Sequence, residues 1–164
     1  MKPQFKVFEK PTLDKNVFFH SSKEVFDYLY QYSKADRELF IIIFLNSKNY
    51  IIDDEIHTAG QVDSSGVFPK QVFRSALIHN ASSLILAHNH PSGDPEPSQQ
   101  DREITKQLVR AGLLLDCRIL DHIIIGDNRY FSFADDGLIE DVERASSILS
   151  SSHRERTPTE QLSF

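Results

Sequence analysis

The sequence predicts an α/β fold in which helices flank a mixed β-sheet. The apolar run from Leu39 to Leu45 is typical of a strand that is buried on both faces. A shorter apolar run, Leu84 to Ala87, leads directly into His88. Segments with apolar residues at helical spacing, opened at Pro69 and at Ser98, alternate with these strand-like runs.

The first half of the chain predicts a helix followed by a hairpin. Residues 1–20 are expected to be extended or irregular, and the serine pair at 21–22 could cap a helix that runs to about Tyr32. After the first buried strand, a polar turn at 46–49 precedes a second strand that begins at residue 50. The two strands therefore read as a hairpin.

The second half predicts two more helices and further short strands. Pro69 opens a helix at a position where its missing N–H costs no hydrogen bond, and Asn80 is a plausible stop. Residues 91–97 hold three prolines and a glycine and must form a loop. The next helix is expected from Ser98 to Gly112. Strands are then expected at about 114–120, 122–125 and 130–133.

Length and composition suit a single folded domain with irregular ends. The chain has 164 residues, of which 40% are hydrophobic, so a sizeable core can form. We expect an N-terminal extended segment over 1–20, the domain over 21–145 and a disordered tail over 146–164. The tail is expected because Ser, Arg, Thr, Pro and Gln dominate the sequence there.

Charge and cysteine content exclude several classes of protein. The formal net charge of −6 disfavours a general electrostatic grip on nucleic acid. Cys117 is the only cysteine, which excludes an internal disulfide framework and the cysteine pair of the zinc deaminases. The N-terminus has no apolar signal-peptide core and no apolar run could span a membrane, so we expect a cytoplasmic protein.

The segment from His88 to Asp101 contains a candidate metal site. His88 and His90 lie two residues apart at a strand end, so both imidazoles leave the same face. The helix that follows the loop can bring Asp101 to a third position around the same point. Two imidazoles and a carboxylate suit zinc and leave a fourth position for a water acidified enough to attack near neutral pH. We therefore predict one zinc ion per chain.

Each part of this pattern also has a simpler interpretation. A histidine pair at strand spacing is more often incidental than catalytic. Ser98 and Asp101 at this spacing also form a plain capping box, which needs no metal. The metal site is favoured by the joint spacing of the histidine pair, the proline-stiffened loop, the serine and the aspartate.

The same spacing resembles a known family pattern. His-x-His, seven residues, Ser, two residues and Asp resembles the JAMM/MPN metalloprotease motif. The string HNHPSGD at 88–94, with Pro97-Ser98 and Asp121-His122 downstream, resembles the RadC family, which bears that domain, over about 36–138. The resemblance implies a JAMM/MPN-like (cytidine-deaminase-like) architecture. RadC-like proteins often carry an N-terminal helix-hairpin-helix region, so this chain resembles the short, single-domain members.

The resemblance also implies roles for individual residues. The zinc ligands would be His88, His90 and Asp101. Ser98 would help to stabilise the developing oxyanion. The family's general base is a glutamate upstream of the histidines at the start of a strand, and Glu38 matches that place best. Glu55 and Glu96 are the alternatives.

Four further positions carry weaker signals. Asn89 departs from the wider JAMM pattern, in which peptidases commonly have Ser or Thr, although it matches RadC. Asp121 and His122 are predicted to be a structural pair that ends a strand, and the alternative is that they orient a ligand histidine. His57 is expected to be structural.

The predicted function is a zinc-dependent hydrolase of JAMM/MPN type that acts on a peptide or isopeptide bond in a peptide or protein substrate. Glu38 would take a proton from the zinc water and return it to the leaving group. The alternative is a DNA-repair-associated accessory or scaffold domain of RadC type without peptidase activity. A link to DNA repair machinery would then exist without strong direct DNA binding, given the acidic charge.

Overall fold

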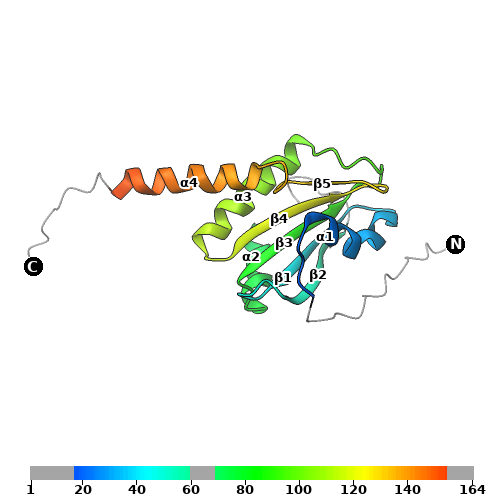
Figure 1. The fold of residues 1–164 in the computed structure, drawn as a ribbon, viewed down its shortest axis with the longest axis horizontal. Helices are drawn as coiled ribbons and strands as arrows, with labels where there is room; N and C mark the ends of the chain where they lie inside the picture. The colour runs from blue at the N-terminus through cyan, green and yellow to red at the C-terminus, as the bar shows by residue number, and fades with distance from the viewer. Residues whose placement is uncertain (1–16, 60–68, 155–164) are drawn as a thin grey trace, which may run out of the picture.

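The computed structural model describes residues 17–59 and 69–154. Most of the expected N-terminal segment and the last ten residues of the expected tail lie outside these ranges. The elements, shown in Figure 1, are α1 (Ser22–Leu29), the 3₁₀ helix η1 (Tyr30–Lys34), β1 (Leu39–Leu45), β2 (Ile51–Ala59), α2 (Pro69–Ile78), β3 (Ser83–Asn89), α3 (Gln99–Leu114), β4 (Arg118–Ile125), β5 (Tyr130–Ser132) and α4 (Leu138–Arg154).

The described strands form one mixed sheet in the order β2-β1-β3-β4-β5. β3 and β4 are parallel, and the other neighbouring strands are antiparallel. α3 connects the parallel pair, as a crossover between parallel strands requires. The predicted α/β class and mixed sheet are therefore confirmed, as is the hairpin of β1 and β2.

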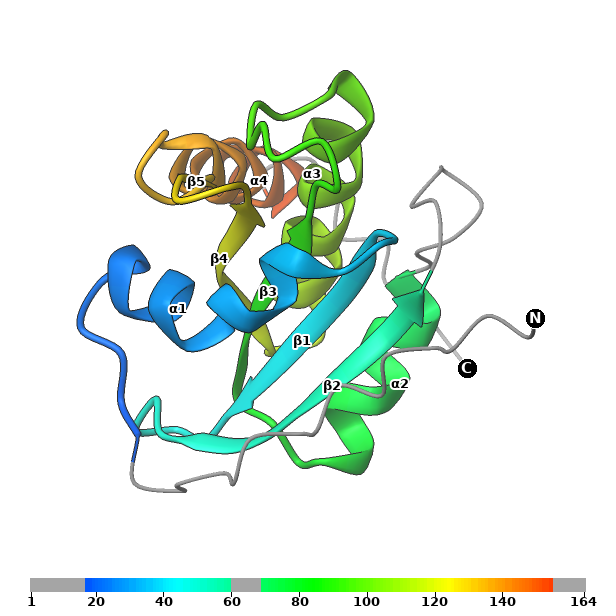
Figure 2. The same ribbon diagram turned by 90° about the vertical axis from the view of Figure 1, so that its right-hand side faces the viewer.

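Helices cover both faces of the sheet, which explains the continuous apolar sequence of β1. Every residue of β1 is buried. Phe40, Ile42 and Phe44 belong to the core cluster under α2, α3 and α4, while Ile41 and Ile43 belong to the cluster under α1 and η1. Figure 2 shows α1 on one face of the sheet and α2 on the opposite face. Successive residues of this strand thus point in opposite directions and pack into two separate cores.

β4 is a single strand where the sequence predicted two. The polar Asp121 suggested a break, but the strand runs through it from Arg118 to Ile125. The Asp121 carboxylate is buried and accepts hydrogen bonds from Ser132 Oγ at 2.7 Å, from the backbone N–H of Ala134 at 2.9 Å and from that of His122 at 2.7 Å. Because its oxygens are satisfied inside the fold, the carboxylate does not interrupt the strand.

α3 continues past the glycine that was expected to end it. Gly112 lies within the helix, which runs to Leu114. A Cβ at this position would lie 2.5 Å from the backbone oxygen of Cys117, where the chain turns back into β4. The glycine is therefore required for close packing between the helix end and the next strand rather than for a cap.

α4 was missed in the sequence, and the predicted tail begins inside it. The helix spans Leu138–Arg154, so residues 146–154 are helical in the structure, and residues 155–164 lie outside the described ranges. Ile139 and Val142 anchor its first turns in the core, whereas Ile148 and Leu149 are exposed. In Figure 1 the helix extends beyond the end of the sheet. Within the described residues, no helix is long and apolar enough to cross a bilayer.

Asp121 should make the stability of the fold depend on pH. Burial raises the pKa of Asp121 to about 6, although the hydrogen bonds from Ser132, Ala134 and His122 oppose the rise. Its unfolded pKa is about 3.9, so the stabilisation associated with this group is complete at low pH and is lost as the pH rises through about 6. Asp121→Asn has no carboxyl group to titrate, so its stability should not show this loss. The asparagine amide can still pair with the same donors and with the Ser132 oxygen.

We therefore expect the free energy of unfolding of Asp121→Asn, relative to the wild type, to increase between about pH 4 and pH 6, by up to about 3 kcal/mol. Urea unfolding of both proteins across this range measures the difference. The exposed Asp36→Asn is the control and should show no such trend. A difference that stays constant with pH would contradict the prediction.

Candidate metal centre

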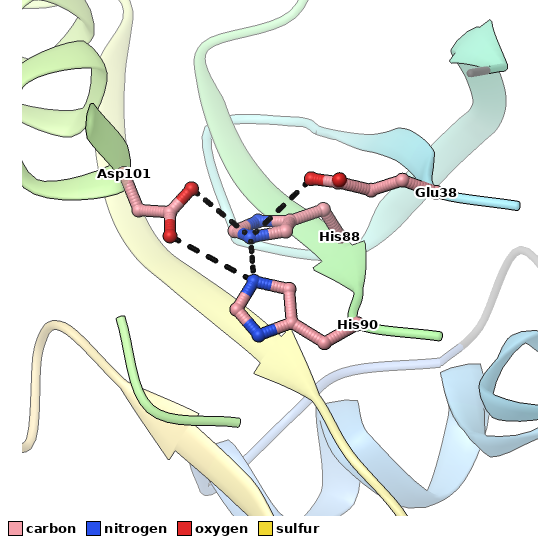
Figure 3. Close-up of side chains that lie close together, drawn as sticks. All are labelled: Glu38, His88, His90 and Asp101. Atoms are coloured by element: carbon pink, nitrogen blue, oxygen red, sulfur yellow. Dashed lines mark hydrogen bonds and ion pairs between the residues drawn. The ribbon is translucent and has the colours of Figure 1, made fainter. Parts of the chain in front are cut away.

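Four side chains from three elements converge at one end of the sheet. His88 and His90 come from the carboxyl end of β3, Glu38 immediately precedes β1, and Asp101 lies in the first turn of α3. Figure 3 shows the four side chains directed towards one another. One potential ligand atom from each lies within 4.8 Å of all the others, so the group could hold a metal ion.

The distances place the two histidine Nε2 atoms at the centre of this group. His88 Nε2 lies 3.0 Å from His90 Nε2 and 3.3 Å from Asp101 Oδ1. Asp101 Oδ2 is 3.7 Å from His90 Nε2. Glu38 Oε1 is the most distant group, at 3.9 Å from His88 Nε2. His88 is almost completely buried, and the Glu38 and His90 side chains are each 18% exposed, so the site opens on their side.

The start of α3 orients the Asp101 carboxylate. Ser98 is the N-cap of the helix, and its Oγ accepts a hydrogen bond from the Asp101 backbone N–H at 3.1 Å. In return, Asp101 Oδ2 accepts from the Ser98 backbone N–H at 2.7 Å and from Ser98 Oγ at 2.6 Å. The capping box is therefore present, and the same box fixes one carboxylate oxygen so that the other faces His88. The predicted oxyanion role of Ser98 would require its hydroxyl to change partner.

The loop after β3 holds His90 through the turn between β4 and β5. His90 Nδ1 lies 2.7 Å from the Asp94 carbonyl oxygen, and the His90 backbone N–H donates to the Ile125 carbonyl. Gly93 has a φ of 81° and accepts a hydrogen bond from Asp127. A Cβ at Gly126 would lie 2.6 Å from the Gly93 oxygen, so this close approach requires glycine. Gly93 and Gly126 thus allow the loop after β3 to pack closely against the β4–β5 turn.

A buried chain of hydrogen bonds runs behind His88. His88 Nδ1 lies 2.9 Å from His122 Nε2, and His122 Nδ1 lies 2.6 Å from Thr105 Oγ1. The Thr105 hydroxyl donates to the Asp101 backbone carbonyl at 2.6 Å, one turn earlier in α3. The chain therefore links one candidate ligand, His88, to the backbone of another, Asp101.

The donors and acceptors in this chain determine the tautomer of His88. Since the Asp101 carbonyl can only accept, Thr105 uses its one proton there and must accept from His122 Nδ1–H. Burial, and then the neighbouring His88, lower the pKa of His122 well below its usual value, so this ring is neutral. His122 Nε2 is then an acceptor, and His88 Nδ1 carries a proton. Consequently, His88 presents the lone pair of Nε2 to the site.

His90 presents its ring to the site in the same way. The Asp94 carbonyl can only accept, so His90 Nδ1 carries a proton and the lone pair of Nε2 faces the site. Two Nε2 lone pairs 3.0 Å apart repel each other unless a cation lies between or beside them. That cation can be a proton on one ring or a metal ion bound by both. The donor set therefore fits a divalent metal such as zinc.

The charges of the site agree with this description. Burial alone would raise the pKa of Asp101, but the neighbouring His88 and His90 rings and the hydrogen bond from Ser98 hold it well below its usual range. Burial alone would lower the pKa of His90, but Asp101 and the Asp94 carbonyl outweigh it and raise the pKa. Without a metal, the site thus holds an anionic carboxylate and favours a proton on His90.

Comparison with known proteins identifies the family. Residues 19–138 match the family model described as the RadC-like JAB domain. The chain belongs to the RadC family. It is 45% identical over 121 residues to a UPF0758 protein of Methanosarcina mazei, which covers 73% of this chain and 53% of that protein. It is 52% identical over 103 residues to a UPF0758 protein of Vibrio atlanticus, which covers 63% of this chain and 46% of that one.

A UPF0758 protein of Pseudoalteromonas translucida is also similar, with 44% identity over 126 residues, covering 76% of this chain and 56% of that protein. The RadC-family chain thus spans about half the length of the curated relatives that it matches. The part of the chain that matches the family model, residues 19–138, contains the candidate metal centre. The names of these relatives state no activity.

The residues that the sequence indicated as metal ligands and general base, His88, His90, Asp101 and Glu38, lie close together. Of the glutamates considered, Glu38 lies in the group, whereas Glu55 contacts His57 on β2 and Glu96 is exposed in the loop before α3. The catalytic and ligand roles remain predictions. Of the Asp121-His122 pair, Asp121 accepts a hydrogen bond from Ser132, while the His122 ring contacts His88. That His122 orients a metal ligand stays a prediction.

Two participants were missed, and neither has a strong sequence signal. Thr105 reads as an ordinary residue of a helix, and only the predicted helical spacing of four from Asp101 could have placed it on the same side. Asn89 was noted as a departure from a pattern, but its contacts with the segment before β1 could not be read from the chain.

Metal binding should weaken as the pH falls. A metal needs His90 in its neutral form, and the pKa of His90 is raised, so protons compete with the metal at a higher pH than for an ordinary histidine of pKa about 6.5. Zinc affinity, measured by competition with a chromophoric chelator between about pH 5 and pH 8, should decrease steadily towards acid pH. An affinity that does not change over this range would contradict the assignment of His90 as a ligand.

Thr105 should contribute to metal affinity without touching the metal. Thr105→Val removes the acceptor of His122 Nδ1–H and so weakens the constraint on the His88 tautomer, and we expect zinc affinity to fall about 10- to 100-fold. Thr105→Ser retains the hydroxyl and is the matched control, for which affinity close to that of the wild type is expected. Equal affinities for the Val and Ser variants would show that the buried chain has no effect.

Proposed function

We propose that this RadC-family protein is a zinc-dependent hydrolase that cleaves a peptide or isopeptide bond in a peptide or protein substrate. The observation that carries the proposal is the convergence of two imidazole Nε2 atoms of defined tautomer with the Asp101 carboxylate, beside a second carboxylate that is partly exposed. Three nitrogen and oxygen ligands with one open position are typical of catalytic rather than structural zinc sites.

His88, His90 and Asp101 would hold the zinc ion. A bound zinc ion supplies a Lewis acid and lowers the pKa of a water molecule, which makes it nucleophilic near neutral pH. The hydrogen bonds of His88 to His122, of His90 to the Asp94 carbonyl and of Asp101 to Ser98 keep the three donors aimed at one point before any ligand arrives. Ligands held in this way do not need to reorganise on binding.

Glu38 would move the proton in this reaction. Its carboxylate is the partly exposed member of the group and lies on the open side, 3.9 Å from His88 Nε2 at Oε1. It would accept a proton from the water that attacks the carbonyl carbon and then donate it to the amide nitrogen as the C–N bond breaks. Asp101 cannot share this task, because its pKa is well below the usual range and its oxygens already face Ser98 and the histidines.

A second candidate rests on the same group of four. Glu38 lies within ligand distance of the others, so it could act as a fourth ligand. A metal with four protein ligands has no open position and is typical of a structural site. The domain would then serve as an accessory or scaffold module without peptidase activity, and its link to DNA repair machinery would be through protein contacts.

Glu38→Gln distinguishes the two candidates. In the hydrolase, the variant should retain about one zinc per chain, since three ligands remain, and lose about 10²- to 10⁴-fold in rate. Elemental analysis gives the zinc content, and a quenched fluorescent peptide library with a lysine-linked isopeptide gives the rate. His88→Ala should lose both zinc and activity.

Glu96→Gln is the matched control, because Glu96 is an exposed glutamate in the neighbouring loop. It should retain both zinc and rate. Loss of zinc from Glu38→Gln, together with no cleavage by the zinc-loaded wild type, would instead support the closed structural site. A fully active Glu38→Gln would exclude Glu38 as the proton carrier.

A further inference from the structure

Asn89 makes two hydrogen bonds that enclose the backbone of Glu38. It is the last residue of β3, lies between His88 and His90, and is completely buried. Its Oδ1 accepts from the Leu39 backbone N–H at 2.8 Å, and its Nδ2 donates to the Arg37 carbonyl at 3.0 Å. One side-chain amide therefore binds the residue on each side of Glu38.

The partners of this amide leave only one orientation for it. The Leu39 N–H can only donate, so it must face the amide oxygen of Asn89. The Arg37 carbonyl can only accept, so it must face the amide NH₂ group. An aspartate here would place a carboxylate oxygen against a carbonyl, and a serine could reach at most one of the two partners. Only an amide of this length satisfies both.

The local strand geometry explains why a side chain is needed here. The ladder between β1 and β3 ends at the pair of Phe40 and His88. Beyond it, the His90 backbone N–H turns to β4 and donates to the Ile125 carbonyl, and Pro91 has no N–H to offer. Leu39, the first residue of β1, therefore lies beyond the ladder with β3, and the amide of Asn89 takes the place of a peptide group as its partner.

We propose that Asn89 is a positioning residue, whose side-chain amide holds the backbone on both sides of Glu38 and so keeps the Glu38 carboxylate beside the metal ligands. The proposal rests on the proposed role of Glu38 as the proton carrier. Asn89 does not itself lie among the four groups of the site, because successive residues along a strand point to opposite faces and the flanking His88 and His90 both face the site. It acts on the chemistry through the Glu38 backbone alone.

The test compares Asn89→Asp and Asn89→Ser with the wild type in the zinc-loaded protein. Both should retain about one zinc per chain and the KM of the wild type for the peptides that it cleaves from the quenched fluorescent library. Their kcat should fall about 10- to 100-fold, as expected for a misplaced catalytic group. In Asn89→Ser, whose shorter side chain removes or weakens the acceptor of the Leu39 N–H, the Leu39 amide should exchange with deuterium faster than in the wild type. Asn89→Asp keeps an acceptor for this N–H and loses the hydrogen bond to the Arg37 carbonyl.

Asn46→Ser is the matched control. Asn46 follows the other end of β1, and its side chain also makes two hydrogen bonds to the backbone, because its Oδ1 accepts from the N–H groups of Lys48 and Tyr50. This variant weakens a similar side-chain clamp on the same strand, far from the metal centre. It should leave zinc content, kcat and Leu39 exchange unchanged, even if the melting temperature falls as much as in the Asn89 variants.

A double variant separates action through Glu38 from other effects. Adding Asn89→Ser to Glu38→Gln should cause no further loss of rate, since the carboxylate that Asn89 positions is already absent. A wild-type kcat in the Asn89 variants, an additive loss in the double variant, or loss of zinc together with activity would each overturn the proposal. If the wild type cleaves none of the peptides, the proposed function fails. Leu39 exchange alone then tests whether the Asn89 amide holds the backbone beside Glu38.

Discussion

The hydrogen bond between His88 Nδ1 and His122 Nε2 joins two parallel strands within the core and determines which nitrogen of His88 offers a lone pair to the candidate metal site. Both rings are completely or almost completely buried, so neither can exchange its partner for water. A neutral His122 leaves His88 a single tautomer, and that tautomer directs a lone pair out of the core. The tautomer of His88 that suits a metal ligand is thus determined by hydrogen bonds inside the core.

Order at this site comes from side chains at the points where regular structure ends. Backbone pairing stops at the carboxyl end of β3, before the first turn of α3 and ahead of β1. At each point a polar side chain makes the hydrogen bonds that backbone pairing no longer supplies: Asn89 beside β1, Ser98 at the cap of α3, and His90 with the Asp94 carbonyl. The candidate catalytic groups occupy positions that a sheet or helix alone would leave free to move.

The sequence predicted what depends on local pattern and missed what depends on contacts across the fold. The apolar run of β1, the histidine pair and the spacing to Asp101 are all local, and the structure contains them together. The continuous β4 was missed because Asp121 reads as polar until Ser132, from the next strand, satisfies it. α4 was missed because its serine-rich second half resembles a tail, while its apolar first half finds its core only in the folded chain.

Because successive side chains along β3 point to opposite faces, three consecutive residues at its carboxyl end make two different kinds of contact. His88 and His90 face the metal position, and Asn89 between them reaches the backbone beside Glu38. Insertion or deletion of one residue in this strand would exchange the two faces, so that neither the ligands nor the clamp could form. The positions of the candidate ligands and of the Asn89 amide therefore both depend on the register of β3.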